Sequence, residues 1–68
     1  MEHIVIGISG MSCQKCVQSV TSVLQALPGV ERVEVALEAG QASLIYDPEQ
    51  ANLAGFRDAI EGAGFDVR

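Results

Sequence analysis

Residues 10–16 read GMSCQKC and mark the point at which an apolar segment gives way to an amphipathic one. The preceding residues 3–8 are rich in β-branched side chains, which favours a strand. From Cys16 onward, apolar residues recur at intervals of three and four, the pattern of an amphipathic helix; they are Val17, Val20, Leu24 and Leu27. The two cysteines therefore lie at the N-terminal end of a helix that we expect over residues 13–27.

Cys13 and Cys16 have the spacing of a metal-binding thiol pair. Residues three apart on a helical turn lie on one face, and the free N–H groups and positive dipole end of a helix N-terminus favour an anionic thiolate. Thiols of Cys-X-X-Cys sequences in such places have lowered pKa values. We therefore interpret both sulfur atoms as candidate ligands of a soft metal ion.

The middle of the chain predicts a β-hairpin. The first helix ends at residues 27–29, which read LPG. Residues 30–37 then alternate apolar and polar side chains, as in a half-buried strand. A glycine-containing turn at residues 38–41 leads into a second strand over residues 41–46. The side chains of that strand expected to face the core are Ala42, Leu44 and Tyr46.

A second helix and a short last strand complete the chain. Asn52 can cap this helix, and the apolar side chains expected to point inward are those of Leu53, Phe56, Ile60 and Ala63. Gly62 and Gly64 release the chain into a strand over residues 65–67. The order βαββαβ predicts an α+β fold of the ferredoxin-like, split βαβ kind, with a four-stranded antiparallel sheet and both helices on one face. The other face would be open, with Val5 and Ile45 among its outward residues.

Length and composition limit the functions that the chain can have. Its 68 residues correspond to one domain, which we expect to span residues 1–68. An apolar content of 49% in regular periods can build a core, so a bound metal is expected to be cargo rather than a structural element. The net charge of -5, with only four Lys and Arg, argues against nucleic acid as a partner. No apolar run approaches the roughly 18 residues of a membrane span, and no signal peptide is evident, so the reducing cytoplasm is the expected location.

Residues 10–16 resemble the G-M-x-C-x-x-C motif of the heavy-metal-associated domain family, and the resemblance extends over the whole chain. The second half also resembles bacterial copper chaperones of this family, in LEAG at residues 37–40 and AGFDV at residues 63–67. The resemblance implies that Cys13 and Cys16 bind a single Cu(I) ion. It further implies that the domain passes this ion to the similar domain of a copper-transporting P-type ATPase, and that the protein is not an enzyme.

The donor chemistry independently favours Cu(I) over zinc. Soft thiolates select Cu(I), whereas structural zinc normally takes four ligands and catalytic zinc at least three from the protein. Only two thiols are present, and His3, the sole histidine, begins a strand whose other end carries the motif, so we do not expect it to be a ligand. Two thiolates leave room for an incoming thiolate from a partner, and the ion can then be handed over without being released.

The residues around the cysteines have simpler interpretations that compete with a role at the metal. We expect Met11 to pack into the core rather than to bind the metal, and Ser12 to cap the helix through its hydroxyl. Lys15 could offset the negative charge of a Cu(I) bis-thiolate, or could simply be solvated. Phe65 matches a position at which bacterial chaperones of the family carry an aromatic residue near the metal loop, and we expect it to shield the site.

Other functions are compatible with parts of this pattern. The Cys-X-X-Cys sequence also occurs in thiol-disulfide oxidoreductases of the thioredoxin kind, but Gln14 and Lys15 stand where those proteins have Gly-Pro, and the chain is too short for that fold. An N-terminal domain of a copper ATPase and a mercury-binding protein share the family motif. A chain running from Met1 to Arg68 without a linker favours a free chaperone. A dimer in which copper bridges two copies is also left open.

Overall fold

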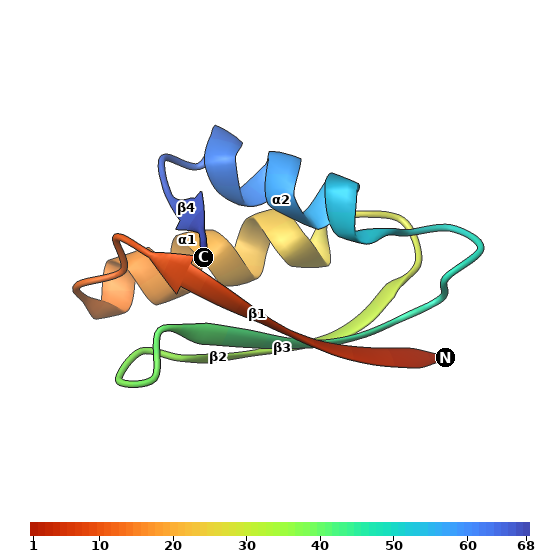
Figure 1. The fold of residues 1–68 in the computed structure, drawn as a ribbon, viewed down its shortest axis with the longest axis horizontal. Coiled ribbons are helices and arrows are strands. Elements are labelled where there is room, and N and C mark those ends of the chain that lie inside the picture. Colours follow the sequence, from red (N-terminus) through yellow and green to blue (C-terminus); the bar gives the residue numbers. More distant parts are fainter.

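The order of elements is βαββαβ in the computed structural model of the protein, which describes residues 1–68 (Figure 1). The four strands and the first helix each lie within two residues of their predicted bounds. The elements are β1 (Glu2–Ser9), α1 (Gln14–Gln25), β2 (Val30–Ala36), β3 (Gln41–Tyr46), α2 (Leu53–Gly62) and β4 (Asp66–Val67). Neither helix has the length and hydrophobicity needed to cross a membrane.

The four strands form one antiparallel sheet in the order β2-β3-β1-β4. β1 is central: it pairs with β3 from Glu2 to Gly7, but with the short β4 only at Ile8 and Ser9. Both helices lie on the same face of the sheet (Figure 1). The predicted ferredoxin-like fold is therefore confirmed, and the loop after β1 lies at the opposite end of the molecule from the N-terminus.

The core lies between this sheet and the two helices. Its buried residues are Ile6, Ile8, Val20, Leu24, Val33, Ala42, Leu44, Ala51, Phe56 and Ile60. Within it, the fully buried ring of Phe56 meets the partly buried Tyr46 edge-on, with the ring centroids 4.9 Å apart and the planes at 83°. Such aromatic pairs stabilise by about 0.5–1.5 kcal/mol beyond the area that they bury. The side chains of β3 that were predicted to face the core, Ala42, Leu44 and Tyr46, therefore do so.

The start of α2 departs from the prediction in one side chain. Asn52 caps the helix as expected, because its side-chain oxygen accepts a hydrogen bond of 2.9 Å from the N–H of Gly55. Leu53, however, is 50% exposed rather than buried. It is the first residue of the helix, and Ala51, just before the cap, takes the place in the core. The helical period correctly identified Phe56 and Ile60 as buried, but it wrongly included Leu53.

The other face of the sheet carries the outward side chains that the alternation predicts. Val5 is 52% exposed, and Ile45 is partly buried. His3 and Ser43 are joined by a hydrogen bond between their side chains, from β1 to β3. This face is not covered by any other element of the chain (Figure 1).

Candidate metal centre

The loop between β1 and α1 carries both cysteines and begins with a glycine that the turn requires. Gly10 has φ 96, a left-handed conformation that favours glycine. A Cβ atom at this position would lie 3.5 Å from Cδ1 of Phe65, so the phenyl ring lies directly against the loop backbone. The chain thus turns sharply out of the sheet and reaches the helix within a few residues.

The backbone of the first helical turn brings the two thiols together. Cys13 is the N-cap residue of α1, and its carbonyl oxygen accepts hydrogen bonds from the N–H groups of Cys16 (3.1 Å) and Val17 (3.3 Å). The two Sγ atoms lie 3.2 Å apart, and both thiols are free. Cys13 is exposed and Cys16 is partly buried. The pair is therefore formed by local helix geometry and is open to an incoming ligand.

The thiol of Cys16 is activated by the loop that precedes it. A hydrogen bond from the backbone N–H of Ser12, followed in importance by one from the Cys13 side chain, lowers the pKa of Cys16 to about 7. Hydrogen bonds to the charged form favour that form, so much of Cys16 is thiolate at neutral pH. A thiolate, not a thiol, is the metal ligand, and one sulfur of the pair is thus ready to bind.

This arrangement differs from the role predicted for Ser12. The N-cap residue of α1 is Cys13, which makes no side-chain capping bond, so the expectation that the Ser12 hydroxyl caps the helix is wrong. The contribution of Ser12 is mainly its main-chain N–H, directed at Cys16. Sequence patterns carry no signal for a main-chain donor of this kind, because any non-proline residue supplies one.

No His, Asp or Glu side chain joins the two cysteines as a further candidate ligand. The chain has no group of three or more His, Cys, Asp or Glu side chains that could hold a metal ion. His3 lies at the far end of β1, hydrogen-bonded to Ser43. The candidate donors at this loop are therefore the two sulfurs of Cys13 and Cys16.

The spacing of the sulfurs fits a metal ion after a small side-chain rotation. With metal–sulfur bonds of about 2.3 Å, two ligands at a tetrahedral angle lie about 3.8 Å apart, and two in a linear arrangement about 4.6 Å apart. The observed separation of 3.2 Å is shorter than either. Because Cys13 is exposed, its side chain can swing outward without disturbing the core. The site thus suits a soft ion of low coordination number.

The neighbours of the pair have different roles. Met11 and Phe65 are partly buried and pack against the core, as predicted for Met11. Lys15 is exposed on the first turn of α1. The exposed Asp66 is the cross-strand partner of Ser9, at the end of β1. The segments that adjoin the cysteine pair therefore supply apolar side chains, a cation at Lys15 and an anion at Asp66.

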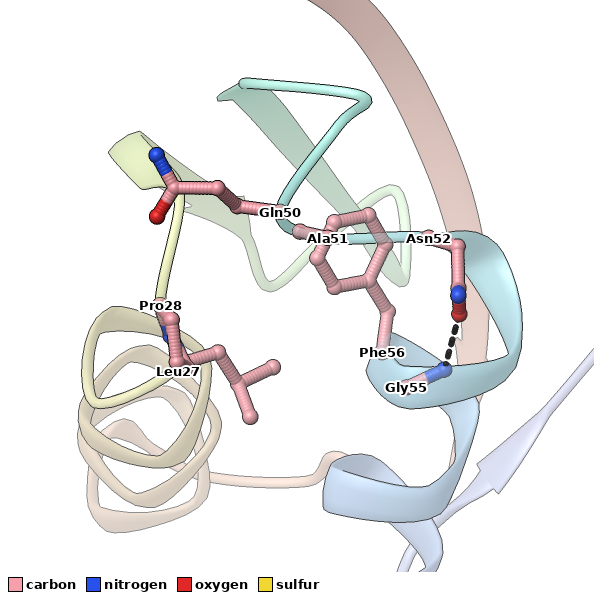
Figure 2. Close-up of a pocket in the computed structure, with 7 residues that line it drawn as sticks. All are labelled: Leu27, Pro28, Gln50, Ala51, Asn52, Gly55 and Phe56. Atoms are coloured by element: carbon pink, nitrogen blue, oxygen red, sulfur yellow. Dashed lines mark hydrogen bonds between the residues drawn. The ribbon is translucent and has the colours of Figure 1, made fainter.

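A hollow lies at the other end of the helices and has no metal-binding chemistry. It has a volume of about 140 Å³ and lies between the end of α1 and the start of α2 (Figure 2). Its lining has no thiol and no charged side chain, and the Asn52 oxygen is already bonded to the N–H of Gly55. The cysteine loop is thus the better candidate for function.

Comparison with known proteins agrees with this site. Residues 5–66 match the heavy-metal-associated domain. The chain belongs to this family. It is 40% identical over 67 residues to the copper chaperone CopZ of Bacillus subtilis (strain 168), a match that covers 98% of this chain and 97% of that protein. The family is defined by its association with metals rather than by catalysis.

A further relative is much longer. The chain is 40% identical over 66 residues to copper-transporting ATPase 1 of Rattus norvegicus. This match covers 97% of this chain but only 4% of the ATPase. The same domain therefore occurs both as a chain of this length and as a small part of a transporter.

Solved structures give the same result. The structure of a CopZ metallochaperone superimposes with a TM-score of 0.96 at 37% identity, over 98% of this chain and 100% of that one. A copper-binding domain from HMA7, a P-type ATPase, gives 0.97 at 34% identity, over 100% of this chain and 92% of that one. Oxidised MerP from Ralstonia metallidurans CH34 gives 0.93 at 24% identity, over 98% and 93% of the two chains, and shares the fold.

Proposed function

We propose that the protein is a copper chaperone: one Cu(I) ion binds between Cys13 and Cys16 and is passed by thiolate exchange to the metal-binding domain of a copper-transporting P-type ATPase. The observation that carries this proposal is the pair of free sulfurs 3.2 Å apart on an accessible loop, one of them with a lowered pKa. Relatives of nearly equal length that are copper chaperones support it.

The choice of Cu(I) follows from the donor set. Two soft thiolates with no His, Asp or Glu side chain to join them suit a soft monovalent ion that accepts low coordination, whereas zinc sites usually take three or four protein ligands. Copper stays monovalent throughout, so no oxidant or reductant is consumed.

Exchange can proceed one bond at a time. A thiol of the partner loses its proton and binds the copper as a third ligand, and one of the two chaperone cysteines then leaves and takes up a proton. Repeating this step moves the ion to the partner pair. The lowered pKa of Cys16 favours the bound state at neutral pH, and the exposure of Cys13 makes it the sulfur that a partner reaches first.

The acceptor is expected to carry a similar loop. The domain of copper-transporting ATPase 1 that matches this chain is of comparable size and 40% identical to it. Transfer between two like sites requires no large difference in affinity, so the direction can be set by onward transport. Two copies of this chain could share one ion in the same way, and we include a copper-bridged homodimer among the proposed states.

A second candidate function is that of a metal-binding domain within a copper ATPase. The match to 4% of the rat transporter supports this alternative. The size of the native polypeptide decides between the two: an antibody should detect a species of about 7.2 kDa for a free chaperone with a single domain over residues 1–68, and a far larger one for a transporter. The cytoplasm, where thiols stay reduced, is the proposed location of the free protein.

Two other functions have less support. A mercury-binding protein of this fold has a structural match at 24% identity, which bears on the fold alone. A thiol-disulfide oxidoreductase would require the cysteine pair to cycle through a disulfide, and the family to which the chain belongs is associated with metals.

Metal analysis tests the proposal most simply. Protein purified anaerobically from cells grown with added copper, zinc and mercury should contain about one copper per chain and little zinc or mercury. When the protein is mixed with an excess of a metal-free ATPase domain, it should pass its copper to that domain during one binding event. Protein that emerges with zinc or without metal would contradict the proposal.

A further inference from the structure

Arg68 connects three segments of the chain at the end of the sheet that leads to the cysteine loop. Its backbone N–H donates a hydrogen bond of 2.8 Å to the carbonyl oxygen of Gly7 in β1. Its guanidinium Nη2 donates to the carbonyl oxygens of Ala39 (3.2 Å) and Gly40 (2.9 Å), in the turn between β2 and β3. One residue thus links the end of β4 to β1 through its backbone and to the hairpin turn through its side chain.

Two glycines provide the space for this side chain. Ile6 and Ile8 face the core, so Gly7 faces the open side of the sheet, where a Cβ atom would lie 3.3 Å from Cβ of Arg68. At Gly40, whose φ is 63, a Cβ atom would lie 2.8 Å from Nη2 of Arg68. The Arg68 side chain therefore lies flat on the backbone of these two residues.

The segment that Arg68 holds is the least extensively paired strand of the sheet. β4 has only two residues, which pair with Ile8 and Ser9. Phe65, just before it, is fixed by a backbone hydrogen bond of 3.1 Å to Ile60 and lies against Gly10 at the start of the cysteine loop. A two-residue edge strand frays easily, and the bonds of Arg68 oppose that fraying.

We propose that Arg68 is a positioning residue for the metal loop: by fastening β4 to the β2–β3 turn, it keeps Phe65 against Gly10 and thereby slows the loss of bound metal to competing ligands. The proposal rests on the proposed function in that it assumes copper bound at Cys13 and Cys16. Arg68 itself acts at a distance, through β4 and the phenyl ring. Its guanidinium forms no ion pair, so its effect comes from directed hydrogen bonds rather than from charge at the site.

Arg68→Met tests this proposal, because it keeps most of the aliphatic stem but removes both side-chain hydrogen bonds. The first measurement is amide hydrogen exchange of the reduced, metal-free protein. The amides of Phe65 and Ile8 should exchange about tenfold faster than in the wild type, the effect expected for two ordinary hydrogen bonds. The buried α1 amides of Val20 and Leu24 should be unchanged, which excludes general destabilisation. Arg57→Met, at an exposed position of α2, is the matched control and should change neither set.

The second measurement is the rate at which copper-loaded protein releases Cu(I) to an excess of a small chelator. Release from Arg68→Met should be several-fold faster than from the wild type or Arg57→Met, and Arg68→Lys, which keeps a donor, should recover part of the loss. Phe65→Ala should release copper quickly whether or not Arg68 is present, because both residues act on the same contact.

Unchanged exchange at Phe65 and Ile8 in Arg68→Met would overturn the proposal, as would faster exchange without faster release. Additive effects of Arg68→Met and Phe65→Ala on release would equally contradict a path through Phe65. A failure of the proposed function is distinguishable from all of these, because the wild type would then take up no copper before any variant is compared.

Discussion

Asp66 is the cross-strand partner of Ser9, so its exposed carboxylate lies at the end of β1 from which the cysteine loop departs. The chain has no Asp or Glu between Ile4 and Leu27. Acidic charge near the thiols must therefore come from the second half of the chain, and Asp66 is a residue of that half which the sheet places there. Glu61, exposed in the last turn of α2, is a second candidate.

Reversing the charge of Asp66 should slow the transfer of copper to a partner ATPase domain. Opposite charges on two proteins accelerate their encounter, and salt screens this effect. We expect Asp66→Lys, and to a smaller extent Glu61→Lys, to reduce the stopped-flow transfer rate several-fold at low salt and less at high salt. The Cu(I) affinity should stay within about threefold, a difference under about 1 kcal/mol.

Glu49→Lys is the control for this prediction, because it makes the same charge change on an exposed residue of the loop at the other end of the molecule (Figure 1). Its transfer rate should match that of the wild type. Rates that respond neither to salt nor to Asp66→Lys would indicate docking by apolar contact around Met11 and Phe65 instead.

The metal-free, reduced protein should keep its fold. Ten buried apolar residues form a continuous core that does not include the cysteines. Copper then adds stability only through binding, by about 2.7 kcal/mol when free metal exceeds the dissociation constant a hundredfold. Far-UV circular dichroism with and without a chelator should give the same spectrum. A spectrum of an unfolded chain after metal removal would show that copper is a structural element.

Phe56 and Leu53 both lie on α2, but they should differ strongly in how much they contribute to the free energy of unfolding. Phe56 is fully buried against Tyr46, and Phe56→Ala should lower the free energy of unfolding by about 3–5 kcal/mol, enough to unfold much of a domain of this size. Leu53→Ala, at a residue 50% exposed, should lower it by about 1 kcal/mol or less. Urea denaturation measures both. Similar losses would contradict the burial described here.

The fold and the cysteine pair were predictable because both depend on local patterns. Alternation in β2 and β3, the three-and-four spacing in α1 and the turns at glycine or proline are each set by neighbouring residues. The exposure of Leu53 was not predicted, because the first residue of a helix faces the core only if the approach of the preceding loop directs it there. In this chain that loop buries Ala51 instead.

Features that depend on distant contacts had no signal in the sequence. Arg68 bonds to Ala39 and Gly40, 29 and 28 residues away, and nothing in its neighbours indicates this. The sequence predicted that the pKa of Cys16 is lowered, but it did not predict which group lowers it. Its main cause is the backbone of Ser12, whose position is set by the turn at Gly10.

The pH dependence of thiol reactivity tests whether the folded structure lowers the pKa of Cys16. In the reduced, metal-free protein, alkylation of Cys16 by iodoacetamide should reach half its maximal rate at pH about 7, and in urea at about 8.5, the ordinary value for a thiol. Ser12→Ala keeps the main-chain donor and should keep the low midpoint. Because the folded-state pKa is lowered, the thiolate stabilises the fold above the ordinary thiol range, and this contribution is lost as pH falls through about 7. Identical profiles for folded and unfolded protein would refute the activation of Cys16.

The most direct measurement is an anaerobic titration of the reduced protein with Cu(I) against a chromogenic chelator. The wild type should withdraw one Cu(I) per chain from the chelator, and Cys13→Ser or Cys16→Ser should each abolish this competition, because a single thiolate cannot complete the pair. His3→Ala should bind as the wild type does, since His3 lies at the other end of β1. Tight binding that survives in either cysteine variant, or a wild type that does not compete for Cu(I), would contradict a two-sulfur copper site at Cys13 and Cys16.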